Sequence, residues 1–401
     1  MRRLALGGAA ALAALALAAA ADAGADPGVG PTEVVLGGTV PLSGEAAAFG
    51  SVGPGAKAYF DYVNARGGVH GRQIRYVFRD DGYDPARTVL LTRQLVEQER
   101  VFAIFNSVGT ENNRAVRPYL NQLGVPQLFV GDGSGAVARP RQYPWTMGFL
   151  QSYRGEGAVY GRTIARTRPR ARLGILLENS ELGREMARGL SRAIAGRGPK
   201  VVASEPYELT ASDVSSQIAK LEASGADTLL LFATPKFAIQ AVVAAHKLAW
   251  RPQLYIASVS IEPGIMAIAR ANAPELTKGA LSIAFLKNPN DPIWSRDPVM
   301  ALYRTVMKRH LPSGRPADVY NFYGMAVAWT MVETLQRAGR ALTRAALLRA
   351  AQRLDTTKNP FLLPGIRLRT SASDYLPLDA VYLYRYDNAQ WVRQGGLVPA
   401  R

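Results

Sequence analysis

Residues 101–130, VFAIFNSVGTENNRAVRPYLNQLGVPQLFV, decide the fold class because they predict one strand–helix–strand unit. The apolar run 101–105 predicts a strand, and the amphipathic segment 111–123 predicts a helix. A second apolar run, 127–130, predicts the next strand. Strands joined through a helix lie parallel in one sheet, so this segment indicates an α/β protein.

The same alternation continues on both sides of this unit. It is too long for one comfortable sheet, so we expect two α/β lobes with parallel sheets flanked by helices. Residues 131–152, which hold glycines, prolines and Trp145, are the expected crossing between the lobes. The other expected strands are 34–39, 72–78, 172–177, 200–205, 228–232 and 253–257, and the other expected helices are 56–66, 85–99, 153–166, 182–195, 212–223 and 236–247.

The N-terminus predicts export. Arg2 and Arg3 precede an uncharged alanine/leucine run, and Ala21-Asp22-Ala23 forms an acceptable cleavage site. Residues 1–23 are therefore predicted to be a signal peptide, with an uncleaved membrane anchor as the alternative. No later segment approaches the ~18 apolar residues that span a bilayer, so the mature protein is expected to be soluble and periplasmic.

Several classes of chemistry lack their residues. The chain has no cysteine, and His70, His246 and His310 are far apart, so neither a thiolate nor a metal-ligand spacing is present. Ser134 in GDGSGA is out of register for a nucleophile elbow, and neither a dinucleotide fingerprint nor a Walker lysine occurs. We therefore expect no catalytic residue, no cofactor and no metal.

The net charge of +17, from 48 basic and 31 acidic residues, raises the question of nucleic-acid binding. The basic residues are spread along helices such as 337–353 without a polybasic block or an aromatic-rich single-strand signature. No nucleic-acid partner is expected. A mild preference for anionic ligands or surfaces remains.

Three turns follow strands of the first lobe, where open α/β sheets bind ligands. They are Pro41–Gly50, Asn106–Thr110 and Gly131–Gly135, rich in glycine and small hydroxyls. Thr110 precedes a helix, so its hydroxyl either caps that helix or, with the free N–H groups, receives a carboxylate. The local sequence leaves both readings open.

Longer segments carry a family resemblance. GGTVPLSGEAAAFG, the helix ending NARGGVHGRQI, the DDGYDP turn and the late YNFYGMAVAWTMVETLQRAGRALTRAALLRAAQRL segment resemble the leucine/isoleucine/valine-binding family. These proteins are periplasmic solute-binding components of branched-chain amino acid ABC transporters. The resemblance implies a type I periplasmic binding protein with two Rossmann-like lobes joined by three hinge crossings. It places residues 32–146 and 281–375 in lobe 1, and residues 147–280 and 376–401 in lobe 2.

The resemblance also implies site residues. Thr110, beside Gly109, falls on the hydroxyl that takes the ligand carboxylate, and Phe49 falls on an aromatic that covers an apolar ligand group. The remaining implied ligand-binding positions are Asp132, Gly133, Ser134, Gln151, Leu182, Thr234 and Val259.

The second lobe departs from the family pattern. Leu182 and Thr234 stand where tyrosines are common, and Val259 stands where an acid pairs with the ligand ammonium. A buried ammonium without a counter-charge is costly. Either Glu262, Glu178 or Asp132 replaces that acid, or the ligand has no α-amino group.

The implied function is that of a monomeric, exported solute-binding protein, not an enzyme. It would bind a small carboxylate-bearing ligand, such as a branched-chain or other amino acid or an aromatic or aliphatic carboxylate, and deliver it to the membrane permease of an ABC importer. The alternatives are a periplasmic ligand-sensing module for a receptor kinase and an exported α/β enzyme.

Overall fold

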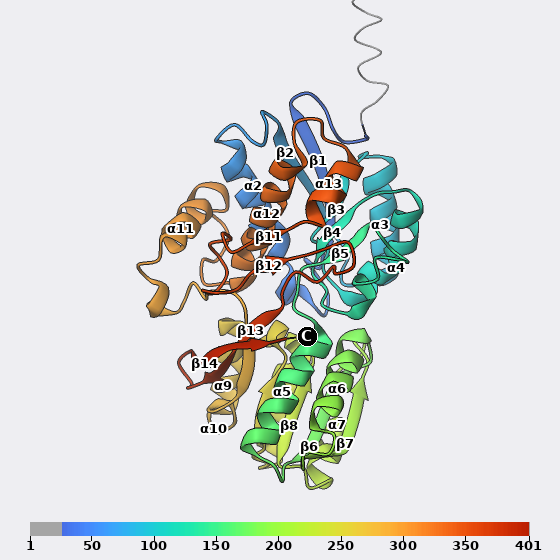
Figure 1. Cartoon of the computed structure of the whole chain (residues 1–401). Coiled ribbons are helices and arrows are strands. Elements are labelled where there is room, and N and C mark those ends of the chain that lie inside the picture. Colours follow the sequence, from blue (N-terminus) through green and yellow to red (C-terminus); the bar gives the residue numbers. More distant parts are fainter. Residues whose placement is uncertain (1–25, 401) are drawn as a thin grey trace, which may run out of the picture.

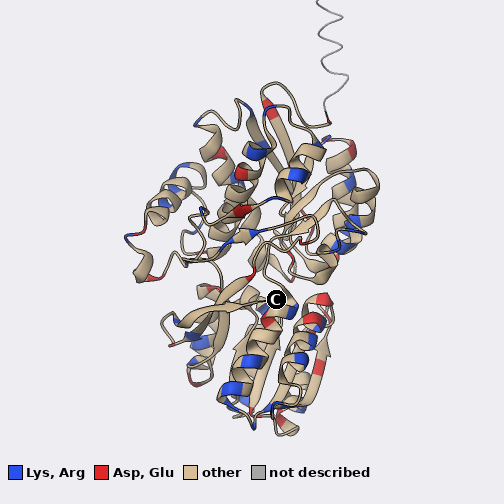
Figure 2. Cartoon of the chain, in the orientation of Figure 1, with Lys and Arg blue, Asp and Glu red and all other residues tan. Residues whose placement is uncertain are grey.

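The computed structural model describes residues 26–400, which form two α/β lobes (Figure 1). The predicted signal peptide lies outside the described residues. Among residues 26–400, no helix combines the length and apolarity that crossing a membrane requires. Lys and Arg are distributed over helices of both lobes (Figure 2).

The first lobe is built on a five-stranded sheet with the order β2-β1-β3-β4-β5, whose neighbouring strands are all parallel. Every residue of β1 after Glu33 is buried, as expected for a parallel strand covered on both faces. The strands are β1 (Glu33–Val40), β2 (Gln73–Asp80), β3 (Ala103–Phe105), β4 (Gln127–Val130) and β5 (Thr146–Gly148).

Helices from two distant parts of the sequence complete this lobe. The 20-residue α12 packs on α2, and a Cβ added at Gly55 of α2 would lie 2.5 Å from the Asn321 carbonyl oxygen of α12. The helices are α2 (Val52–Asn64), α3 (Pro85–Glu97), α4 (Thr110–Gln122), α11 (Pro298–His310), α12 (Val319–Ala338) and α13 (Arg344–Ala351), with the small pair β11 (Asp355–Thr356) and β12 (Leu368–Arg369) nearby.

The second lobe contains a seven-stranded sheet with the order β14-β13-β10-β9-β8-β6-β7. Its strands β6 to β10 are parallel where they pair, whereas β13 and β14 join antiparallel. The strands are β6 (Arg172–Glu178), β7 (Lys200–Tyr207), β8 (Thr228–Phe232), β9 (Gln253–Ile256), β10 (Leu281–Ala284), β13 (Ala380–Tyr386) and β14 (Trp391–Pro399), and the helices are α5 (Tyr153–Thr167), α6 (Glu181–Ile194), α7 (Ser215–Ala223), α8 (Pro235–Lys247), α9 (Pro263–Asn272) and α10 (Pro274–Thr277).

The chain passes between the lobes three times: between β5 and α5, after β10, and between β12 and β13. The predicted two-lobed α/β fold with three crossings is therefore confirmed. Two predicted boundaries are wrong. Residue 147 was expected to begin lobe 2, but β5 pairs with β4 in the first sheet as far as Gly148. Residue 281 was expected to begin the return to lobe 1, but β10 pairs with β9 and β13 in the second sheet, so the return follows residue 284.

Most predicted helices and strands are present, with shifted ends. The first helix begins at Val52 instead of residue 56, because Gly53 and Gly55, which suggest a loop in the sequence, lie inside the helix. Those glycines permit close packing, since a Cβ at Gly53 would lie 3.0 Å from Val40. The helix expected at 212–223 begins at Ser215.

Candidate functional site

A cleft of ≈ 170 Å³ lies between the two lobes. This is more room than a single water needs and comparable with the roughly 150 Å³ cavity that admits benzene in an engineered core. Phe49, Val108 and Tyr320 line it from the first lobe, and Leu182 and Val259 line it from the second. The cleft can therefore hold a small organic molecule in contact with both lobes.

The structure brings six of the ten sequence-predicted residues to the cleft lining: Phe49, Gly109, Gln151, Leu182, Thr234 and Val259. Thr110, Asp132 and Ser134 are buried immediately behind this lining and are joined by hydrogen bonds. Gly133 packs against the crossing, since a Cβ there would lie 2.2 Å from the Gln151 carbonyl oxygen.

The turn before α4 owes its shape to Gly109. Its φ of 113° lies in the left-handed region, and a Cβ would lie 2.5 Å from Asn112 Oδ1. This backbone makes Gly109 the N-cap and Thr110 the first helical residue. The reading of Thr110 as a helix cap is therefore wrong, and among the described residues no side chain caps α4.

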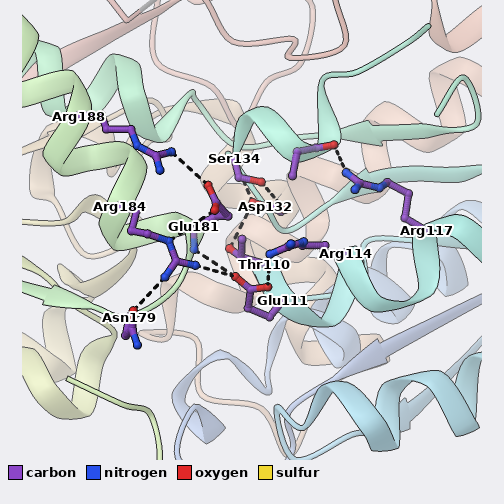
Figure 3. Close-up of polar contacts among 11 residues, drawn as sticks. Thr110, Glu111, Arg114, Arg117, Asp132, Ser134, Asn179, Glu181, Arg184 and Arg188 are labelled. Carbon is purple, nitrogen blue, oxygen red and sulfur yellow. Dashed lines mark hydrogen bonds and ion pairs between the residues drawn. The ribbon is translucent and has the colours of Figure 1, made fainter. Parts of the chain in front are cut away.

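The Thr110 hydroxyl donates instead to Asp132 Oδ1, at 3.3 Å (Figure 3). The same carboxylate accepts the Ser134 N–H at 2.7 Å and the Ser134 hydroxyl at 2.9 Å. Asp132 is fully buried, and desolvation raises its pKa to about 7 although these hydrogen bonds oppose the shift. The region behind Thr110 thus holds a carboxyl group that is protonated or charged according to pH.

A second buried carboxyl group lies at the end of β6. Burial raises the pKa of Glu178 to about 7, and the Tyr207 hydroxyl lies 3.4 Å from Glu178 Oε2. The same Tyr207 hydroxyl is hydrogen-bonded to Thr234 Oγ1 at 3.3 Å, with either oxygen as the donor. Thr234 therefore connects the cleft lining to Glu178. Glu262 serves a different purpose, since it caps α9 by accepting the Ile265 N–H at 2.9 Å.

Aromatic residues that sequence reasoning missed dominate much of the lining. Tyr320 packs edge-on against Phe49 with ring centroids 5.2 Å apart, and its hydroxyl donates across the cleft to the Val259 carbonyl at 2.8 Å. Tyr83 of the DDGYDP turn also contacts Phe49, at 6.4 Å between centroids. The other missed aromatic lining residues are Tyr153, Phe285, Trp294, Phe322, Tyr323, Tyr384 and Trp391.

The signal for these residues was weak. Tyr320 and Tyr323 lie in YNFYGMAVAW, an almost wholly apolar segment that predicts a buried helix without indicating which side meets a ligand. Only Tyr83 had a local clue in the sequence, because it lies in the DDGYDP turn. The structure gives it a φ of 64°, which is uncommon outside glycine.

The lining has little positive charge. Within the described part of the chain, its one cationic side chain is Lys287, whose ammonium is held by Asp297 at 2.8 Å and by the Pro360 carbonyl at 2.9 Å. A ligand carboxylate would therefore depend on N–H and O–H donors. Free N–H groups at the start of α4 and the Tyr323 hydroxyl, which has no hydrogen-bond partner among residues 26–400, are such donors.

The rim of the cleft is closed by contacts between the lobes. Glu111 of α4 accepts the N–H of Glu181, the first residue of α6, at 3.1 Å, and Arg184 lies 3.9 Å from the same oxygen (Figure 3). Further along α6, Glu185 accepts the Gly135 N–H at 2.8 Å. These bonds join separate lobes, so opening the cleft would break them.

Two α/β lobes, three crossings and a ligand-sized cleft between the lobes define a type I periplasmic binding protein. The chain belongs to the periplasmic binding protein family, whose sequence model matches residues 33–390.

Individual proteins agree with this assignment. The chain is 26% identical over 223 residues to Leu/Ile/Val-binding protein homolog 7 of Brucella abortus, covering 53% of this chain and 54% of that protein. The chain thus spans about half the length of the curated relatives it matches.

Solved structures extend the likeness to nearly the whole fold. A fatty acid ABC transporter substrate-binding protein from Thermomonospora curvata superposes with a TM-score of 0.81 at 21% identity, over 94% of each chain. A branched chain amino acid ABC transporter structure from Thermus thermophilus, with bound valine, also has a TM-score of 0.81, at 18% identity over 92% of this chain and 97% of the other.

Proposed function

We propose that this protein is an exported solute-binding protein of an ABC importer that closes its lobes over a small carboxylate with an apolar body. The observation that carries the proposal is the cleft itself, which both lobes line with aromatic and aliphatic side chains. Family membership supports the binding role. The proposal also includes delivery of the solute to a membrane permease. It further includes that the protein is periplasmic, monomeric and not catalytic.

In this proposal, one lobe consists of residues 32–148 and 285–375. The other consists of residues 149–284 and 376–400. This division keeps the predicted boundaries except the two that β5 and β10 correct. Bonds such as Tyr320 to Val259 would form on closure and give the closed state an affinity advantage. A permease that recognises both closed lobes would then respond to occupancy.

The ligand carboxylate is placed at the start of α4. The N–H groups there lack a side-chain cap within the described chain, and the positive helix end favours an anion. Thr110 contributes by orienting Asp132, which is able to hold a proton near neutral pH beside an anionic ligand. The apolar body would contact Phe49, Leu182 and Val259.

Whether the solute is an amino acid depends on whether the site supplies a counter-charge for its amino group. Val259 supplies no counter-charge, and its carbonyl already accepts the Tyr320 hydroxyl. Glu262 is engaged in capping α9. This arrangement supports aliphatic or aromatic carboxylates over leucine, isoleucine and valine.

A thermal-shift screen tests the function. The panel contains the three branched-chain amino acids, their des-amino carboxylates, and 3-phenylpropanoate. A bound ligand far above its dissociation constant raises the melting temperature, by linkage to the folded state. Shifts with the carboxylates support the proposal, shifts with leucine alone contradict the des-amino preference, and no shift with any compound contradicts carboxylate binding. Turnover of a bound compound would favour an enzyme instead.

A further inference from the structure

A buried polar network at the first crossing holds an unfilled hydrogen-bond acceptor in a residue that lines the cleft. Gln151, which lines the cleft and is fully buried, donates through its amide nitrogen to Glu156 Oε2 and to Ser258 Oγ, each at 2.7 Å. Its amide oxygen, Oε1, has no hydrogen-bond partner among residues 26–400. A buried carbonyl oxygen without a donor is costly, so this atom calls for a partner.

Glu156 determines which end of the amide is free. Its carboxylate is buried and accepts from Tyr160 at 2.6 Å, from the Ser258 N–H at 2.7 Å and from the Ser258 hydroxyl at 2.8 Å. Because the Ser258 hydroxyl donates to this carboxylate, its oxygen is available to accept from Gln151. A carboxylate accepts only, so the Gln151 nitrogen must face it and the oxygen must face away.

The residue that carries the free acceptor lies between the lobes. Gln151 belongs to the crossing between β5 and α5, whereas Ser258 follows β9 and precedes Val259, which lines the cleft. Through Ser258, the network therefore reaches the part of the cleft lining where the family resemblance implies an acid and this chain has Val259. The side chain bonded to this segment is the neutral Gln151 amide, which Glu156 holds, and not an acid.

We propose that Gln151 Oε1 selects ligands that carry one neutral hydrogen-bond donor, a hydroxyl, on their apolar body, and that Glu156 is the positioning residue that orients it. One acceptor matches one O–H. An ammonium has three N–H donors, and this network leaves a single acceptor for them. The inference rests on the proposed carboxylate-binding function and narrows it to hydroxy-carboxylates.

Matched compounds on two carbon skeletons test the proposal. The parents are 4-methylpentanoate and 3-phenylpropanoate. The donor-bearing partners are the 2-hydroxy analogue of each parent, together with 3-(4-hydroxyphenyl)propanoate and leucine. Calorimetry on the full mature chain gives the affinity ratio of each hydroxylated compound to its parent. We expect a hydroxylated member of at least one skeleton to bind about tenfold to a hundredfold more tightly than its parent, and leucine to bind more weakly than the hydroxy acid.

Two variants separate selection from folding. Gln151→Met removes the acceptor, and Glu156→Gln lets the Gln151 amide turn, so each should bring the hydroxylated-to-parent ratio close to one, whatever change the affinity for the parent itself shows. Gln240→Met is the matched control, because Gln240 lies on α8 outside the cleft lining, and it should leave the ratio unchanged.

The outcomes are distinct. Parents that bind as tightly as all their hydroxylated partners overturn this inference and leave the proposed function intact. A ratio that survives in both variants also overturns it. Leucine binding more tightly than the hydroxy acid overturns the assignment of a neutral donor. If no compound binds at all, the proposed function fails, and the inference fails with it.

Discussion

Glu111, in the first turn of α4, and Glu181, the first residue of α6, lie where the two helices meet across the cleft, and the Glu111 carboxylate accepts the Glu181 backbone N–H at 3.1 Å. Glu111 thus lies in the first turn of α4 and also satisfies an opening N–H of α6. Both helix starts carry partial positive charge, so the carboxylate is favoured by each. The bond exists only while the lobes are together.

Glu111→Gln should shift the lobes toward the open form, because the neutral amide interacts less with both helix starts and with Arg184. We expect a loss of about 0.5–1 kcal/mol from the closed state. Small-angle scattering should show a larger radius of gyration without ligand. Glu99→Gln, which breaks an ion pair with Arg79 inside lobe 1, is the control and should leave the radius unchanged. Equal radii for all three proteins would contradict the closure role.

Tyr320→Phe should weaken binding of any carboxylate that the screen identifies. The variant keeps the edge-on contact with Phe49 and removes only the 2.8 Å bond to the Val259 carbonyl. A cost of about 1 kcal/mol, roughly a fivefold weaker affinity, is expected, mainly through faster dissociation. Stopped-flow and calorimetry measure it. Tyr303→Phe removes a comparable bond to the Pro316 carbonyl inside lobe 1 and should not change dissociation.

Thr110→Val should reduce carboxylate affinity by more than it reduces stability. The variant removes the hydroxyl that orients Asp132, with an expected cost of about 1–2 kcal/mol in binding. Thr110→Ser keeps the hydroxyl and should retain most of the affinity. Calorimetry and urea unfolding on the same samples compare the two losses. Unchanged affinity in Thr110→Val would remove Thr110 from the site.

Asp132 should make the folded state less stable as the pH rises. Burial raises its pKa to about 7 from 3.8, so between these values the folded protein binds a proton that the unfolded chain has released. The free energy of unfolding therefore falls with rising pH across this window, by up to about 1.4 kcal/mol per pH unit. Above pH 7 the contribution no longer changes.

Asp132→Asn is the variant that isolates this slope. Its amide remains uncharged, so urea unfolding between pH 5 and 8 should show a smaller decline than the wild type, with a residual slope from Glu178, whose pKa is also raised to about 7. A proton held by Asp132 also reduces repulsion of an anionic ligand, so carboxylate affinity in the wild type should fall above pH 7. Parallel stability curves for the two proteins would contradict the assignment.

Gly55→Ala should destabilise lobe 1. The added Cβ would lie 2.5 Å from the Asn321 carbonyl oxygen, where α2 crosses α12, and overpacking of this kind costs about 1–3 kcal/mol. Differential scanning calorimetry should show a lower melting temperature. Gly396→Ala on β14 meets nothing within 4 Å and should be near neutral. A melting temperature equal to that of the wild type would show that the helices can separate without cost.

The sequence by itself determined the α/β class, the two lobes and the first crossing, because strand and helix periodicity and the turns between them are local properties. The number of crossings came from the family resemblance. It also brought attention to the turns that hold Phe49 and Gly109, since both follow strands where ligands bind in such folds. The family resemblance added Gln151, and all three residues line the cleft. The role of Thr110 was not decided locally. The sequence left two roles for its hydroxyl, a cap on α4 or a contact with a ligand carboxylate. In the structure the left-handed Gly109 takes the capping position, and the hydroxyl donates to Asp132.

Only the tertiary structure decided the remainder of the site. Tyr320 lies 61 residues from Val259 along the chain, and Ser258 lies 102 residues from Glu156, so no local pattern relates them. The burial that raises the pKa of Asp132 likewise comes from the packing of the whole lobe. Contacts and desolvation depend on which distant segments meet, and sequence periodicity does not record that.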